Sequence, residues 1–152
     1  GIRETLRTGM PEDVRVKKIA GHAVLMAQSG QYNVSRCRRH GEEAAARLAC
    51  CEFVNHTLAM LFLLNERHMP FYKWAFRAAK ELPKLSEIIP TLEALLREPD
   101  EDTIERVSAA VIEELRAQGL TDGGWDFLEP HAYAVMRRIQ NPEIAALHIM
   151  EV

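Results

Sequence analysis

The feature that most restricts the fold of this chain is an apolar run in its first half, residues 44–64. The last part of the run, residues 57–64 (TLAMLFLL), is almost wholly apolar. The run is long enough to span a membrane, but four polar residues interrupt it, and each would be costly in lipid. These four are Arg47, Glu52, Asn55 and His56. Because a helix that is apolar nearly all round is typical of the centre of a bundle, we expect a core helix over residues 42–65.

The rest of the chain also has helical periodicity, and no long alternating run of β-branched residues predicts a strand. A first helix is expected to begin near Pro11 and to stop at Gly30. Further helices are expected over residues 70–83, 85–97, 102–119, 130–140 and from Pro142 to the C-terminus, the third of them opened by a capping box of Asp102 and Glu105. The pattern predicts an all-α fold, a helical bundle of about six or seven helices around one long apolar central helix.

Length and composition favour one globular domain over residues 1–152, because 47% of the residues are hydrophobic and 27% are charged. Three Cys are too few for a disulfide framework, and the adjacent Cys50 and Cys51 favour a reduced, cytoplasmic setting. The chain opens with a polar segment and not with a signal peptide. Since it begins with Gly1, we expect it to be the C-terminal fragment of a longer protein.

The net charge of -3 conceals a strong asymmetry between the two halves of the chain. Residues 1–80 contain 13 Lys and Arg against 7 Asp and Glu, whereas residues 81–152 contain 6 against 15. An anionic partner is therefore expected to bind the first half. The alternative is that the two halves pack together and their charges offset each other.

Motifs for catalysis or metal binding are weak. Cys37 and His40 form one Cys-x-x-His pair, but a structural zinc site needs a second pair, so no metal site is expected. No Gly-rich phosphate loop is present. Arg15 and His22 are two helical turns apart on one face, a spacing that helical ribonuclease toxins allow. An exposed helix face explains the same pair without any activity.

Two basic and aromatic segments are more informative, GQYNVSRCRRHG at residues 30–41 and FYKWAFRAAK at residues 71–80. Guanidinium groups match phosphate or carboxylate oxygens, and aromatic rings offer surfaces on which a base can stack. The alternatives are core packing for the aromatic residues and a solvated face for the basic ones. The predicted substrate-binding residues are Tyr32, Asn33, Arg36, Arg39, Tyr72, Lys73, Trp74 and Arg77.

The first of these segments, together with FLLNERHMPFYKWAFRAAKELPKL at residues 62–85, resembles a helical domain of unknown function. In bacterial proteins that domain follows a small polymerase-beta-type nucleotidyltransferase domain. The later segments LTDGGWDFLEPHA (120–132) and IQNPEIAALHIM (139–150) resemble its end. The resemblance implies a bundle like the C-terminal helical domain of kanamycin-nucleotidyltransferase-like enzymes. The catalytic domain of those enzymes has a Gly-Ser helix start and an Asp-x-Asp metal pair on a sheet, and neither is present here. The one Asp-x-Asp of this chain, Asp100 with Asp102, lies in an acidic loop and opens a helix, so capping explains it. No catalytic residue and no cofactor is therefore expected in this chain.

The function implied by the resemblance is that of an accessory, substrate-binding domain. Its partners would be a nucleotidyltransferase domain in cis, which would use Mg²⁺ and a nucleoside triphosphate, and a small anionic or nucleotide-bearing substrate. No membrane partner is expected, and a homo-oligomer remains open. The alternatives are a stand-alone helical ribonuclease that uses Arg15 and His22, and a plain protein-interaction domain. We further predict that residues 30–41 and 71–77 lie side by side, although a straight core helix between them would place them at opposite ends.

Overall fold

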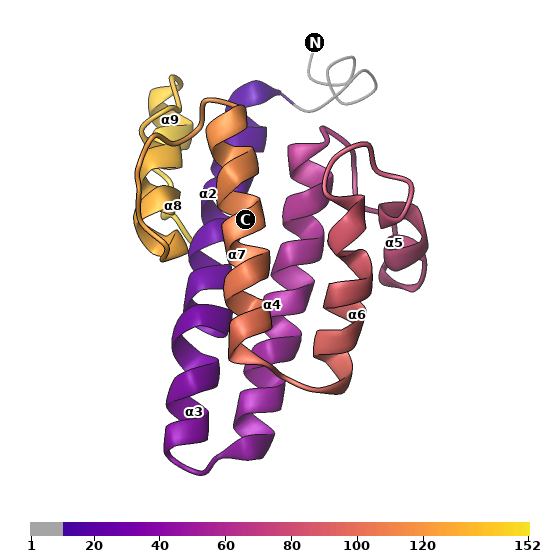
Figure 1. Ribbon diagram of the computed structural model, residues 1–152. Coiled ribbons are helices and arrows are strands. Elements are labelled where there is room, and N and C mark those ends of the chain that lie inside the picture. Colours follow the sequence, from indigo (N-terminus) through magenta and orange to yellow (C-terminus); the bar gives the residue numbers. More distant parts are fainter. Residues whose placement is uncertain (1–10) are drawn as a thin grey trace.

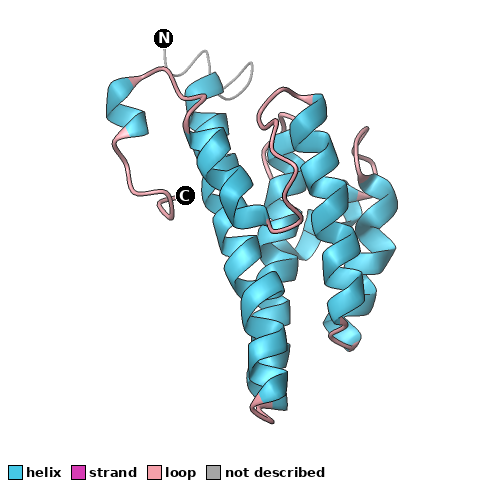
Figure 2. Ribbon diagram, turned by 60° about the vertical axis from the view of Figure 1, so that its left-hand side comes forward, coloured by secondary structure: helices cyan, strands magenta, loops and turns pink. Residues whose placement is uncertain are grey.

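The structure, a computed structural model, describes residues 11–152, and every regular element in that part of the chain is a helix (Figures 1 and 2). The elements are α2 (Glu12–Met26), η1 (Ala27–Val34), α3 (Ser35–Arg39), α4 (Glu43–Leu64), α5 (Tyr72–Ala79), η2 (Ser86–Ile88), α6 (Ile89–Arg97), α7 (Glu101–Ala117), α8 (Leu128–Met136) and α9 (Pro142–Ala145). The predicted all-α fold class is confirmed.

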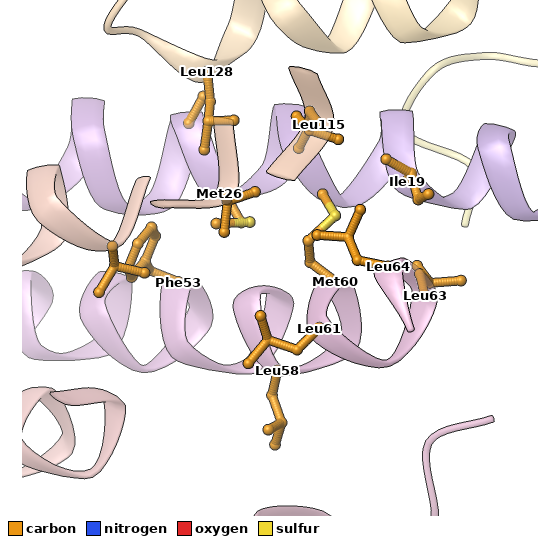
Figure 3. Close-up of a cluster of buried hydrophobic side chains, with 14 of the residues drawn as sticks. Ile19, Met26, Phe53, Leu58, Met60, Leu61, Leu63, Leu64, Leu115 and Leu128 are labelled. Carbon is orange, nitrogen blue, oxygen red and sulfur yellow. The ribbon is translucent and has the colours of Figure 1, made fainter. Parts of the chain in front are cut away.

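Helix α4 is the centre of the bundle, as its apolar sequence predicts. It packs against α2, η1 and α6, and its side chains Phe53, Met60, Leu61 and Leu64 are fully buried (Figure 3). Within the described residues it is the one helix long and apolar enough to cross a membrane, with a mean hydropathy of 1.3 over 18 residues. More than half of that stretch is buried against other helices, which fits the core helix of a bundle.

The first helix does not stop at Gly30, and that prediction is wrong. α2, η1 and α3 follow one another without a break from Glu12 to Arg39, and η1 is a wide, π-type segment within this long helix (Figure 1). Gly30 is present for a different reason, since a Cβ atom at this position would overlap the ring of Phe53 on α4. The glycine therefore allows close approach of two helices and does not end the first one.

The remaining helix ends are set by local caps, some of which differ from the predictions. The side chain of Asp100, and not that of Asp102, caps α7 by accepting a 2.9 Å hydrogen bond from the backbone N–H of Thr103. Gly119 follows α7 with a φ of 71°, so the predicted glycine stop is confirmed. Helix α8 begins at Leu128, two residues before the predicted Pro130, and ends at Met136.

The helix predicted from Pro142 to the C-terminus is too long, because α9 stops at Ala145. The chain then runs along α2, where the buried ammonium group of Lys17 donates hydrogen bonds to the carbonyl oxygens of Ile149 and Glu151. Burial lowers the pKa of Lys17, although the nearby Glu151 opposes that effect. Because a buried ammonium group needs acceptors, free carbonyl groups of a non-helical segment suit this place better than helical ones.

Candidate functional site

The first set of predicted binding residues lies on the long N-terminal helix, where η1 passes into α3. We call Tyr32, Asn33, Arg36 and Arg39 the Tyr32 surface. Because Tyr32 and Arg36 are four residues apart, they are neighbours on the helix. The Nη1 atom of Arg36 donates a 2.9 Å hydrogen bond to the hydroxyl of Tyr32, and its guanidinium carbon lies 5.6 Å from the ring centroid. The Tyr32 side chain is 50% exposed.

A pocket of about 360 Å³ lies beside this surface. It is lined by Gln28, Tyr32, Asn33, Phe127 and Glu129. Its two sides come from η1 and from the start of α8, which are far apart in the sequence. Wide turns of this π type often occur at functional sites in helices. The pocket therefore combines an aromatic wall, carboxamides, the carboxylate of Glu129, which accepts a 3.4 Å hydrogen bond from Gln28, and, next to it, the cationic Arg36.

Gln31 holds the two sides of the pocket together, and the sequence analysis missed it. Its Oε1 atom accepts a 2.8 Å hydrogen bond from the backbone N–H of Leu128. Its Nε2 atom donates to the carbonyl oxygen of Asp126 at 3.0 Å and to the carboxylate of Glu105 at 3.1 Å. Gln31 thus fastens the loop before α8 to η1, while the neighbouring Tyr32 lines the pocket. No local pattern identifies Gln31, because its partners are more than 70 residues away.

The arginines of α3 differ sharply in their partners. Arg38 forms ion pairs with Glu43 at 3.1 Å and Glu98 at 3.3 Å, and it donates a 2.8 Å hydrogen bond to the carbonyl oxygen of Pro99. These contacts raise its pKa, mainly through the hydrogen bond to Glu43. In contrast, Arg36 and Arg39 are exposed and form no ion pair with any carboxylate of residues 11–152. Arg38 is therefore structural, whereas Arg36 and Arg39 remain available to an anion.

The second set of predicted binding residues lies on α5, which has an unusual division of faces. The helix buries only the small Ala75 and Ala79. Three large aromatic residues at its start face solvent, since Phe71 is 66% exposed, Tyr72 71% and Trp74 54%, whereas Phe76 packs partly buried against the core. The guanidinium carbon of Arg77 lies 5.4 Å from the Trp74 ring centroid. We call Phe71, Tyr72, Lys73, Trp74 and Arg77 the α5 surface.

The Tyr32 surface and the α5 surface do not meet, so the prediction that the two segments lie side by side is wrong. In Figure 1, α3 lies beside the start of α4, whereas α5 lies on the far side of the bundle, near the other end of α4. The amide of Asn65, the residue that caps the end of α4, is hydrogen-bonded to Lys84 beyond α5, which keeps α5 near that end. The straight α4 spans about 33 Å at about 1.5 Å per residue, which separates the two surfaces. One small ligand cannot contact both.

The Arg15 and His22 pair of the ribonuclease hypothesis is engaged within the protein. The Arg15 side chain is only 7% exposed. Its guanidinium donates hydrogen bonds to the carbonyl oxygen of Leu63 and the side chain of Gln118, both at 3.1 Å, and pairs with Glu12 at 3.0 Å. His22 faces His56 and not Arg15, with 3.1 Å between the two Nδ1 atoms. Arg15 thus holds the end of α4 in place.

Residues 11–152 contain no group of three or more His, Cys, Asp and Glu side chains that could hold a metal ion. Cys37, Cys50 and Cys51 are free thiols. Burial raises the pKa of the Cys50 thiol to about 11, so this thiol stays protonated at neutral pH. Cys50 therefore lacks the lowered pKa of an activated nucleophile.

Comparison with known proteins gives one partial match. No curated protein and no solved structure is similar to the chain. A family model described as Domain of unknown function (DUF4037) matches residues 1–75. That range is just under half of the chain and includes α2, η1, α3, α4 and the first four residues of α5, with Tyr72 and Trp74. The first half of this chain, with the Tyr32 surface and most of the α5 surface, is therefore similar to the DUF4037 domain of unknown function.

Proposed function

We propose that this chain is an accessory, substrate-binding helical domain of a nucleotidyltransferase-like protein. The observation that carries the proposal is the Tyr32 surface, where Arg36 is fixed on a half-exposed tyrosine ring, has no carboxylate partner among the described residues, and borders a pocket. The resemblance of residues 30–41 and 62–85 to a domain that follows nucleotidyltransferase domains supplies the context.

The chemistry of the Tyr32 surface suits an anionic or nucleotide-bearing acceptor. The guanidinium of Arg36 can hold two oxygens of a phosphate or carboxylate, and Arg39 adds a second positive charge on the next turn. The hydrogen bond to Tyr32 fixes the Arg36 side chain in advance, which lowers the entropy lost on binding. Phe127 and the Tyr32 ring offer apolar walls, and Asn33 offers a donor and an acceptor. The volume of about 360 Å³ lies within the range of small-molecule sites.

In this proposal the chain binds and positions the acceptor, and the nucleotidyl transfer takes place elsewhere. Mg²⁺ and the nucleoside triphosphate would be held by the nucleotidyltransferase domain in cis. The ribonuclease alternative has less support, because Arg15 is used to hold the end of α4.

The test is a titration with a nucleoside triphosphate at two salt concentrations. We expect a dissociation constant near a millimolar, about -4 kcal/mol, since only one wall of the cleft is present. Replacing Arg36 and Arg39 together by Ala should abolish binding. The matched control replaces Arg137 and Arg138, which lie at the end of α8 and carry the same charge, and should retain it. Equal losses in both double variants would refute a specific site, because they would show only a general electrostatic attraction.

A second candidate function, protein interaction, is favoured by the α5 surface. Three large exposed aromatic side chains within four residues at the start of α5 are more than a solvated surface normally shows, and such residues are enriched at interfaces. In this reading the nucleotidyltransferase domain in cis docks on α5. The test uses a protein that carries both domains. Replacing Tyr72 and Trp74 by Ser should leave its melting temperature unchanged but should make the segment that joins the two domains more sensitive to protease. The control is Tyr133→Ser on α8, a residue that is also exposed. Unchanged proteolysis in the α5 variant would contradict this docking.

A further inference from the structure

A third basic site lies in a cleft that neither candidate function uses. The cleft, of about 240 Å³, separates the middle of α2 from the segment that follows α4. It is lined by Lys18, His22, Ala59, Phe62, Leu63, Arg67, His68 and Met69. Four of these side chains carry nitrogen donors, two from α2 and two from the segment after α4, and none is a carboxylate. The cleft therefore presents donors to its content from two sides.

Of the acidic residues on the elements around this cleft, Glu52 acts on His56, where it opposes the lowering of the pKa by burial, and two others are engaged elsewhere. Glu12 and Glu66 both pair with Arg15, at 3.0 Å and 3.8 Å. Lys18 and Arg67 form no ion pair with a carboxylate of the described residues, unlike the structural Arg38. The positive charge of the cleft is thus not offset within the part of the chain that the structure describes.

The C-terminal end of α4 does not need these cations. Positive side chains commonly cluster near a helix C-terminus to satisfy its last carbonyl groups. Here the carbonyl oxygen of Leu63 accepts from Arg15 at 3.1 Å, and that of Leu64 accepts from Gln118 at 2.8 Å. The backbone N–H of Arg67 satisfies the carbonyl oxygen of Phe62 at 3.0 Å. The side chains of Lys18, Arg67 and His68 are therefore free to bind something else.

His22 is arranged to donate into the cleft. Its Nδ1 atom is 3.1 Å from Nδ1 of His56, and only one of these two atoms can carry the hydrogen of that contact. Burial, followed by the charges of His56, Lys18 and Lys17, lowers the pKa of His22 to about 4, so the ring is neutral at pH 7. If His56 donates to Nδ1 of His22, the hydrogen of His22 is on Nε2. An acceptor in the cleft favours this tautomer.

We propose that this cleft binds the phosphate group of a phosphate monoester. The ammonium of Lys18 and the guanidinium of Arg67 supply charge, and the imidazoles of His22 and His68 supply further N–H donors, a combination that matches phosphate oxygens. Phe62, Leu63 and Met69 line the rest of the cleft, and its volume of about 240 Å³ leaves room for the organic group of a monoester beside the phosphate. This proposal does not rest on the Tyr32 surface or on the α5 surface.

The experiment is isothermal titration of the purified chain with glycerol phosphate and, separately, with inorganic phosphate. We expect saturable binding of glycerol phosphate and a loss of at least tenfold in affinity in the K18A/R67A variant. The matched control is R137A/R138A, which removes the same charge from the end of α8, and it should bind like the unmodified chain. If K18A/R67A does not fold, the R67A/H68A variant, which changes only exposed residues, takes its place.

Each result decides the proposal. The proposal is overturned if glycerol phosphate shows no saturable binding up to about 20 mM, a rough upper concentration for a millimolar site. It is also overturned if the two double variants lose the same amount of affinity. Tighter binding of inorganic phosphate than of glycerol phosphate would show that the site takes a free ion and would refute the monoester. Loss of binding in R36A/R39A would assign the phosphate to the Tyr32 surface, which would also refute the cleft.

Discussion

The replacement of Gly30 by Ala tests the central packing of this bundle, because two effects of opposite sign meet at that residue. Ala favours the interior of a helix over Gly by about 1 kcal/mol, so helix propensity alone predicts that the change stabilises the protein. In the structure, however, a Cβ atom at residue 30 overlaps several ring atoms of Phe53. The Phe53 side chain is fully buried and cannot turn aside without displacing its neighbours.

We expect the overlap to dominate. Overpacking of a dense core costs about 1–3 kcal/mol beyond what it gains, so Gly30→Ala should destabilise the chain by about 2 kcal/mol. At about 2–4 °C per kcal/mol for a domain of this size, the melting temperature should fall by about 4–8 °C. Thermal unfolding followed by circular dichroism measures this shift. The control is Gly124→Ala, since a Cβ atom there meets nothing within 4 Å and should leave the melting temperature nearly unchanged.

A double-mutant cycle with Phe53→Leu identifies the cause. Leu is smaller than Phe, so this change alone should cost stability, but in the Gly30→Ala background it should cost much less or restore stability. We expect a coupling free energy of at least about 1 kcal/mol between the two residues. If Gly30→Ala raises the melting temperature, or if the two changes add to within about 0.5 kcal/mol, close approach of η1 and α4 is not the reason for this glycine.

Three further predictions concern stability and its dependence on pH. Burial and neighbouring charges lower the pKa of His22 to about 4 in the folded chain. Between about pH 6.5 and pH 4 this residue is therefore protonated in the unfolded chain but neutral in the folded chain. The free energy of unfolding should consequently fall as the pH drops from 6.5 to 4, by at most about 3 kcal/mol. Thermal melts over this range should show a clearly smaller fall for His22→Asn, and an equal fall would contradict the assignment. The buried hydroxyl of Ser108 has no hydrogen-bond partner among the described residues. Ser108→Ala should therefore leave the midpoint of chemical denaturation unchanged or raise it. A fall of more than about 1 kcal/mol in the free energy of unfolding would contradict this and indicate a partner of the hydroxyl. The buried His131 donates from Nε2 to the carbonyl oxygen of Trp125 at 2.7 Å, which leaves its Nδ1 to accept from the hydroxyl of Thr121 at 2.8 Å. Thr121→Val should therefore cost about 1–3 kcal/mol in urea unfolding, whereas a neutral result would show that this hydrogen bond does not stabilise the fold.

The two basic and aromatic segments show where sequence reasoning about the site succeeds and where it stops. The sequence identifies Arg36 and Lys73 as exposed cations beside aromatic residues, and both are accessible to solvent in the structure. It cannot show that α4 keeps them apart, because it contains no information on which helices return along which face. It also cannot separate Arg36 from Arg38, because the carboxylate of Glu98, which binds Arg38, lies 60 residues further along the chain.

Local physics was sufficient for the fold class and for most helix ends. The apolar run that forms α4 predicts a core helix by itself, because only a central position in a bundle removes so continuous an apolar surface from water. Gly119 predicts the end of α7, because a positive φ at the residue after a helix depends only on that residue and its immediate neighbours. Such features depend on atoms within a few residues of one another, so the sequence alone determines them.

Tertiary structure decided the features that depend on two distant segments in contact. Gly30 is a residue type that commonly ends helices, yet it lies within one. A glycine is needed there because Phe53 of α4 occupies the space that a side chain would fill. The C-terminal segment leaves the helical conformation where its carbonyl groups accept hydrogen bonds from the buried Lys17. Gln31 becomes the link that closes the Tyr32 pocket only once α8 lies beside η1. In each case the stabilising free energy comes from a contact between atoms that are remote in the sequence, and local periodicity does not predict such contacts.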